Sequence, residues 1–112
     1  MDCVFCKIVD GEIPSNKLYE DEEVLAFYDL DPQAPIHFLV IPKKHLGSAL
    51  ELTGEDSAVA GKVFSIIAEI AERLNLSDGL RVVTNVGYDG GQSVDHLHFH
   101  VLAGRQLSWP PG

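Results

Sequence analysis

The chain has 112 residues, enough for one domain built around one hydrophobic core. Its 17 acidic and 8 basic residues give a net charge of −9. This charge argues against binding to DNA or RNA polymers, which depends on Lys and Arg, but a mononucleotide is not excluded because backbone N–H groups and imidazoles can hold one phosphate. No apolar run approaches the roughly 20 residues that span a bilayer, and the N-terminus lacks the features of a signal peptide. We therefore expect a cytoplasmic protein, outside the membrane, with reduced thiols.

Short elements are predicted in the first half of the chain. A helical turn comes first, two strands then form a hairpin around an acidic turn, and a third strand follows a proline-rich turn. In the second of these strands, the period of two places Leu25, Phe27 and Asp29 on one face. The elements are expected over residues 3–9, 17–20, 24–29 and 36–41.

The second half of the chain predicts one long helix and two more strands. Thr53, followed three residues later by Asp56, is typical of a helix start, and the apolar residues from Val59 to Leu74 follow the 3.6-residue period. The pattern as a whole predicts a single α+β domain over residues 1–112, an antiparallel sheet with one main helix. The remaining expected elements are strands over residues 80–86 and 94–103 and a glycine-rich loop over residues 87–93.

Three histidines, His96, His98 and His100, alternate with apolar residues near the C-terminus. In a strand they share one face, with the outer two roughly 13 Å apart, too far for a single metal ion to bind all three. This row favours nucleophilic or acid–base chemistry spread over a phosphate and its leaving group. A metal site that uses two of the three, or a strand with histidines in a structural role, is the alternative.

The glycine-rich loop over residues 87–93 leads directly into the histidine row. Its glycines would let backbone N–H groups approach an anion, and Ser93 could add a hydroxyl donor. An ordinary hairpin turn is the alternative for this loop. Its position beside the histidines favours the phosphate interpretation.

Cys3 and Cys6 form a Cys-x-x-Cys pair, which is half of a zinc site. His45 and His96 are the available partners, and two buried free thiols are the alternative. His37, taken alone, is typical of a buried structural histidine. Trp109 in the C-terminal tail is expected to dock on the protein or on a partner subunit, because an exposed indole is costly.

The segment over residues 96–102 resembles the signature of the histidine triad (HIT) family, three histidines that alternate with apolar residues. The similarity extends over essentially the whole chain, including residues 31–45 and the Gly-Gly-Gln-Ser-Val segment before the triad. The ending, Gly-Arg-Gln-Leu-Ser-Trp-Pro-Pro-Gly, resembles the branch of nucleotide-binding HIT proteins that hydrolyse nucleoside phosphoramidates.

This resemblance implies a homodimer joined through a continuous antiparallel sheet and a site for a purine nucleoside monophosphate. It makes His98 the nucleophile on phosphorus, with His100, His37 and His96 as the other catalytic histidines. A structural zinc, not needed for catalysis, is implied on Cys3, Cys6, His45 and His96. The residues implied to contact the nucleotide are Asp29, Asn85, Gln92, Ser93, Phe5, Ile8, Phe27 and Leu30.

Other functions stay open at this point. A dinucleoside polyphosphate hydrolase is a related possibility, although the C-terminal ending argues against it. A nucleotide-binding scaffold with weak catalysis and a small zinc-binding structural module are possibilities of a different class. Val86 and Tyr88, beside the phosphate loop, depart from the family pattern and put the leaving group in doubt.

Overall fold

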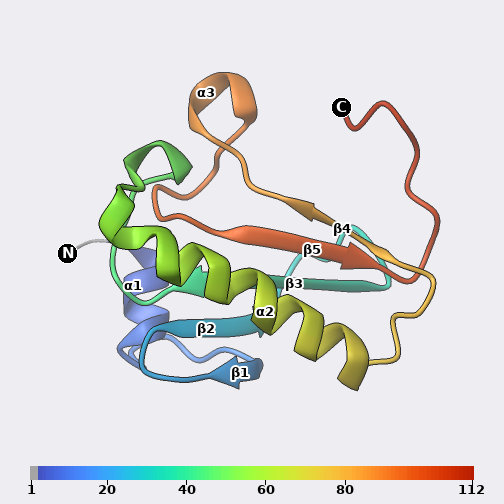
Figure 1. Ribbon diagram of the computed structural model, residues 1–112, viewed down its shortest axis with the longest axis horizontal. Coiled ribbons are helices and arrows are strands. Elements are labelled where there is room, and N and C mark those ends of the chain that lie inside the picture. The colour runs from blue at the N-terminus through green and yellow to red at the C-terminus, as the bar shows by residue number, and fades with distance from the viewer. Residues whose placement is uncertain (1–2) are drawn as a thin grey trace.

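The computed structural model describes residues 3–112 as a five-stranded antiparallel sheet in the order β1-β2-β3-β5-β4 (Figure 1). The last strand in the chain, β5, inserts between β3 and β4, so His100 lies in the interior of the sheet, and His96 and His98 lie in the segment that leads into it. The predicted α+β class, with one main helix, is confirmed. The elements are α1 (Val4–Val9), β1 (Lys17–Glu20), β2 (Val24–Tyr28), β3 (Ile36–Pro42), α2 (Ser57–Arg73), β4 (Leu80–Val83), α3 (Gly87–Gly90) and β5 (Phe99–Ala103), with 3₁₀ turns at Ala49–Glu51 and Gly54–Asp56.

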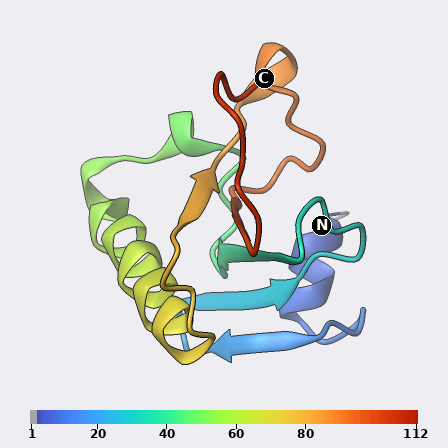
Figure 2. The same ribbon diagram turned by 90° about the vertical axis from the view of Figure 1, so that its right-hand side faces the viewer.

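Helix α2 covers one face of the sheet and buries its apolar stripe there (Figures 1 and 2). The predicted capping box is present: the Asp56 carboxylate accepts a hydrogen bond from the Thr53 backbone N–H at 3.1 Å. The turn that it begins is 3₁₀ and precedes the α-helix. The residues that meet under α2 include Val63, Ile66, Ile67, Ile70, Leu97, Phe99 and Val101.

Helix α1 lies on the opposite face, as the edge-on view in Figure 2 shows. The predicted alternation in β2 is confirmed, because Leu25 and Phe27 face α1 while Val24 and Ala26 face α2. The histidines of the triad therefore face α1, since Leu97, Phe99 and Val101 pack toward α2. The second core cluster consists of Cys3, Phe5, Ile8, Leu25, Phe27, Leu39 and Ile41.

Three predictions for the last third of the chain were wrong in extent. The strand expected over residues 80–86 ends at Val83, the strand expected over residues 94–103 begins at Phe99, and the glycine-rich loop contains the single helical turn α3. The segment before β5 uses its backbone groups elsewhere: Thr84 Oγ1 donates to the His98 carbonyl at 2.9 Å, and the Leu97 N–H donates to the Leu46 carbonyl. Within residues 3–112, no helix is both long and apolar enough to cross a membrane.

Candidate functional site

A cavity of about 280 Å³ opens on the α1 side of the sheet. Its walls come from α1, the loop before β1, the end of β2, and the segment that leads into β5. Most of its lining residues are apolar, and the polar ones include Asp29, Ser93, His98 and His100. The lining residues are Val4, Phe5, Ile8, Ile13, Pro14, Ser15, Phe27, Tyr28, Asp29, Leu30, Leu39, Ser93, Val94, His98 and His100.

The backbone sets which nitrogen of His98 carries the proton. Its Nδ1 lies 2.6 Å from the carbonyl oxygen of His96, and a carbonyl can only accept a hydrogen bond. Nδ1 therefore carries the hydrogen, and Nε2 keeps a free lone pair. The Phe5 ring meets the His98 ring edge-on at a centroid distance of 5.1 Å, which limits its rotation. A buried imidazole with an unprotonated Nε2 beside a cavity is suited to nucleophilic attack.

A second chain of hydrogen bonds orients His37 and His100. The Gln33 backbone N–H donates to His37 Nδ1 at 3.0 Å, so the proton of neutral His37 lies on Nε2. This Nε2–H donates to His100 Nδ1 at 2.9 Å, and the proton of neutral His100 therefore lies on its own Nε2. Burial, followed by the charges of His98 and His37, lowers the pKa of His100, which favours the neutral form at pH 7.

The structure separates the remaining sequence-predicted residues into three groups. Phe5, Ile8, Phe27, Leu30, Asp29 and Ser93 line the cavity with His98 and His100. His37 is buried with both ring nitrogens hydrogen-bonded, as expected of a structural histidine, and it is joined to the cavity through His100. Among the described residues, Asn85, Gln92 and His96 lie outside the cavity lining.

The Gln92 side chain holds the loop over residues 87–93 in place through three hydrogen bonds. Its amide nitrogen donates to the carbonyls of Gly47 at 2.7 Å and Val94 at 2.9 Å, and its amide oxygen accepts from the Gly87 N–H. The N–H groups of Gly91 and Gln92 also bond within the loop. The expectation that these loop N–H groups are free for a phosphate was therefore wrong for Gly87, Gly91 and Gln92.

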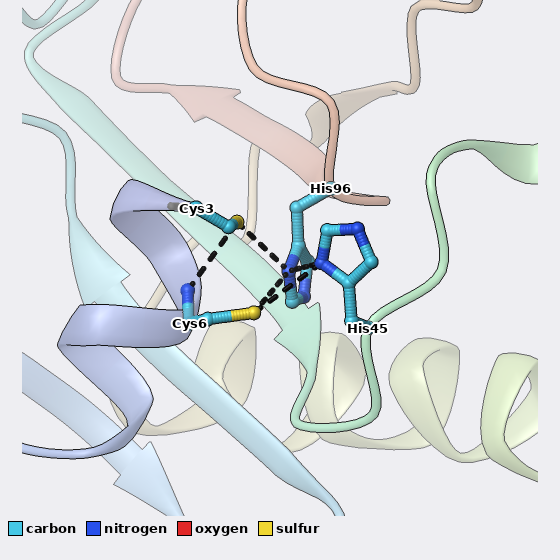
Figure 3. Close-up of side chains that lie close together, drawn as sticks. All are labelled: Cys3, Cys6, His45 and His96. Carbon is cyan, nitrogen blue, oxygen red and sulfur yellow. Dashed lines mark hydrogen bonds between the residues drawn. The ribbon is translucent and has the colours of Figure 1, made fainter. Parts of the chain in front are cut away.

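Cys3, Cys6, His45 and His96 converge into one cluster, drawn in Figure 3. Four pairs of donor atoms are close: Cys3 Sγ–His96 Nδ1 at 3.5 Å, Cys6 Sγ–His45 Nδ1 at 3.3 Å, Cys6 Sγ–His96 Nδ1 at 3.6 Å and His45 Nδ1–His96 Nδ1 at 3.2 Å. Tetrahedral zinc with bonds of about 2.3 Å to sulfur and 2.0 Å to nitrogen separates its ligand atoms by about 3.3 to 3.8 Å. This group can hold a metal ion, and its distances fit a tetrahedral one.

The surroundings of His96 favour the metal-ligand role over a catalytic one. Its Nε2 donates to the Pro42 carbonyl at 2.8 Å, which leaves the Nδ1 lone pair directed at the thiols and His45. Burial is the main cause that lowers the pKa of His96, so the ring is held neutral, as a ligand must be. Burial and the adjacent Cys3 raise the pKa of the Cys6 thiol, an effect that a bound cation would reverse.

Asp29, His37 and His100 also bring three donor atoms together. The hydrogen-bond directions disfavour a cation there, because His37 Nε2 carries a proton and uses it toward His100. Asp29 Oδ2 lies 3.5 Å from that Nε2, while Oδ1 accepts from the Asp31 N–H. His37 and His100 are therefore hydrogen-bonded to each other, and the Asp29 carboxylate lies beside the pair.

Some lining residues were missed by the sequence reasoning. Leu39 pairs with Phe27 across β2 and β3, a register that no local pattern contains. Ser15 and Pro14 come from the loop before β1, and Val4 from the exposed side of α1. The alternation of residues in β3, combined with the pairing of β2 and β3, could have indicated Leu39.

The tail that carries Trp109 lies along β4. The Arg81 guanidinium donates to the carbonyls of Leu107 and Ser108 and lies 6.0 Å from the centre of the indole. Trp109 is 79% exposed. The prediction that it docks on its own chain was therefore wrong for most of the residue's surface. Docking on a partner subunit stays a prediction.

Three alternating histidines that lead into the inserted strand of an antiparallel sheet, two of them at the wall of a cavity, are typical of the histidine triad class of protein. The HIT domain model matches residues 10–107, and the chain belongs to the HIT family. It is 49% identical to an uncharacterized HIT-like protein of Synechococcus elongatus, over 99% of this chain and 97% of that protein.

Solved structures agree with this assignment. A HIT family hydrolase from Legionella pneumophila has a TM-score of 0.97 at 46% identity, covering 99% of this chain and 100% of that one. A histidine triad protein from Clostridium difficile has a TM-score of 0.93 at 50% identity, covering 96% of this chain and 95% of that one.

Proposed function

We propose that this protein is a hydrolase that cleaves purine nucleoside 5′-phosphoramidates at the P–N bond. The observation that carries the proposal is the free Nε2 lone pair of His98, set by the 2.6 Å hydrogen bond from Nδ1 to the His96 carbonyl at the wall of a largely apolar cavity. The similarity to a HIT family hydrolase supports the reaction class. The C-terminal ending supports the phosphoramidase branch.

The reaction has two steps. His98 Nε2 attacks phosphorus, the P–N bond to the amine breaks, and a nucleotidyl-histidine forms. Water then attacks the same phosphorus, releasing the nucleoside monophosphate and returning the electron pair to Nε2. Covalent attack divides the hydrolysis into two easier transfers.

The amine leaves readily only if it receives a proton. In this proposal the Nε2–H of His100 faces the substrate and gives its proton to the leaving amine, while the hydrogen bond from His37 Nε2–H to His100 Nδ1 stabilises the electron pair left on the ring. The water that attacks in the second step gives a proton back to His100 Nε2. Asp29 Oδ2 accepts from a ribose hydroxyl, since Oδ1 is already used by the Asp31 N–H. Ser93 donates to a phosphate oxygen, and Phe5, Ile8 and Phe27 surround the base.

We also propose that Cys3, Cys6, His45 and His96 hold a structural zinc ion. Two sulfurs and two imidazole nitrogens are a common donor set for zinc, and the separations of 3.2 to 3.6 Å between these atoms suit a tetrahedron. Zinc would supply a cross-link between α1 and the segment before β5. His96 then ligates through Nδ1 while its carbonyl orients His98.

A homodimer completes the proposal. Strand β4 pairs only with β5 among the described strands, so its other edge can extend the sheet into a second copy. Phe64 on α2 contacts Phe99 at a centroid distance of 5.8 Å and remains 53% exposed, which adds an apolar surface near this edge.

The test is the hydrolysis of a fluorogenic adenosine phosphoramidate by the wild type and by His98→Ala. We expect turnover to fall at least about 1,000-fold in the variant, with AMP affinity and melting temperature close to the wild type. Diadenosine tetraphosphate is the comparison substrate, and we expect it to be hydrolysed far more slowly. A folded wild type that binds AMP without turnover would favour the scaffold function instead, and preferred cleavage of the polyphosphate would favour the related hydrolase.

A further inference from the structure

The loop before β1 contributes an unusual polar atom to the cavity. Among residues 3–112, Ser15 Oγ is the single buried side-chain oxygen or nitrogen that has no hydrogen-bond partner. Ser15 is at the same time one of the residues that line the cavity. Buried hydroxyls are nearly always hydrogen-bonded, so an exception beside a cavity indicates a partner that arrives with a ligand.

The other polar side chains of the cavity already have roles in the proposed function. His98, His100 and Ser93 lie at the phosphate, and Asp29 serves the ribose. Tyr28 packs toward the α2 side of the sheet. The lining residues that remain for the base are apolar side chains and Ser15.

A purine base has polar edges, and burying them without hydrogen bonds opposes binding. We infer that the Ser15 hydroxyl binds the polar edge of the purine base and is the side chain that recognises it. A rotation about its one side-chain torsion can turn Oγ toward the base, and no existing hydrogen bond has to break. Because a hydroxyl both donates and accepts, it serves the amino group of adenine and the carbonyl of guanine equally.

This inference rests on the proposed function, since it requires a nucleotide in the cavity. The test compares Ser15→Ala with the wild type in the metal-loaded protein by titration calorimetry with AMP, GMP and ribose 5-phosphate. Ribose 5-phosphate lacks the base and reports on the phosphate and ribose contacts alone. Ser65→Ala is the matched control, because the Ser65 hydroxyl lies on the exposed side of α2 and bonds to the Gly61 carbonyl.

We expect Ser15→Ala to weaken the binding of both AMP and GMP by about 5-fold, the effect of one hydrogen bond, and to leave the binding of ribose 5-phosphate unchanged. The melting temperature without nucleotide should equal or exceed that of the wild type, because the variant loses an unpartnered hydroxyl. A residue with a purely structural role would show the opposite pattern.

Four results would overturn the inference. If Ser15→Ala binds AMP as well as the wild type does, Ser15 does not recognise the base, although the cavity still binds the nucleotide. Equal weakening of AMP and ribose 5-phosphate means that the effect comes through the shape of the cavity. A wild type that binds AMP no better than ribose 5-phosphate contradicts the proposed function as well. If Ser15→Ala weakens the binding of only one of the two nucleotides, Ser15 does not recognise both purines equally.

Discussion

Single hydrogen bonds to the backbone decide the chemistry of the histidines. His96, His98 and His37 each meet a backbone group that can only accept or only donate, so the protonated nitrogen of each ring is determined. Residue type alone leaves two tautomers open for every histidine. The sequence therefore identified the triad but not which nitrogen faces the substrate.

Replacing His37 tests this orientation. His37→Ala removes the donor to His100 Nδ1, so we expect kcat to fall by about 10- to 100-fold because His100 loses its fixed tautomer. The Kd for AMP should stay within about 2-fold, since His37 does not line the cavity. His37→Gln, whose amide can donate, should recover part of kcat. Steady-state kinetics and calorimetry measure the two quantities, and a parallel loss of both would contradict a positioning role.

Helix α1 is short, and its attachment depends on side chains at both of its ends. Its apolar residues pack on the sheet, and its cysteines meet His45 and His96 from distant parts of the chain. Because Val4, Phe5 and Ile8 also line the cavity, the proposed metal site and the proposed nucleotide site share this helix.

Removal of the metal tests that connection. We expect about one zinc ion per wild-type chain by elemental analysis and much less in Cys6→Ala. A ligand that binds only the folded state at 1,000 times its Kd stabilises it by about 4 kcal/mol, so chelation should lower the wild-type melting temperature and weaken AMP binding. Cys6→Ala is the control and should not respond to the chelator. An unchanged wild-type melting temperature after verified metal removal would contradict a structural metal.

The hairpin of β1 and β2 carries a cluster of ion pairs. Lys17 and Lys43 each lie 2.8 Å from a carboxylate oxygen of Glu20, and their hydrogen bonds lower the pKa of Glu20 to about 2. A carboxylate whose pKa is lower in the folded state stabilises that state above its ordinary pKa of 4.5. The contribution is lost as the pH falls from 4.5 toward 2.

We expect the wild-type melting temperature to fall more steeply than that of Glu20→Gln over this pH range. Glu22→Gln is the matched control, because Glu22 is an exposed residue of the same turn that lies outside this ion-pair cluster. Thermal melts followed by circular dichroism at several pH values provide the measurement. Parallel curves for the wild type and Glu20→Gln would show that the ion pairs do not stabilise the fold.

At the level of the whole molecule, the free edge of β4 and the exposed Trp109 both indicate a second copy of the chain. We expect sedimentation to give a mass of about twice the chain's 12.2 kDa. Phe64→Glu should shift the protein toward the monomer, because the charge would be buried in the interface. Leu50→Glu is the control, as an equally apolar and 83% exposed residue of the 3₁₀ turn Ala49–Glu51. A wild-type monomer at all concentrations would contradict the dimer.

Several features of this protein could be determined from the sequence by itself. The alternation in β2, the capping box before α2, the apolar stripe of α2 and the HIT signature are all local, because the periods of strands and helices depend on backbone geometry and on which face is buried. Even the convergence of Cys3, Cys6, His45 and His96 was expected, from residue type and from the family resemblance.

Only the tertiary structure decided how distant segments meet. The insertion of β5 between β3 and β4 places His100 beside His37, which is 63 residues away, and joins the buried His37 to the cavity by a hydrogen bond. The early end of β4 and the loop position of His96 and His98 follow from hydrogen bonds made by Thr84, Gln92 and Leu46. Strand order and such long-range hydrogen bonds depend on the register between segments, and that register is set by the packing of the whole fold, which no local pattern contains.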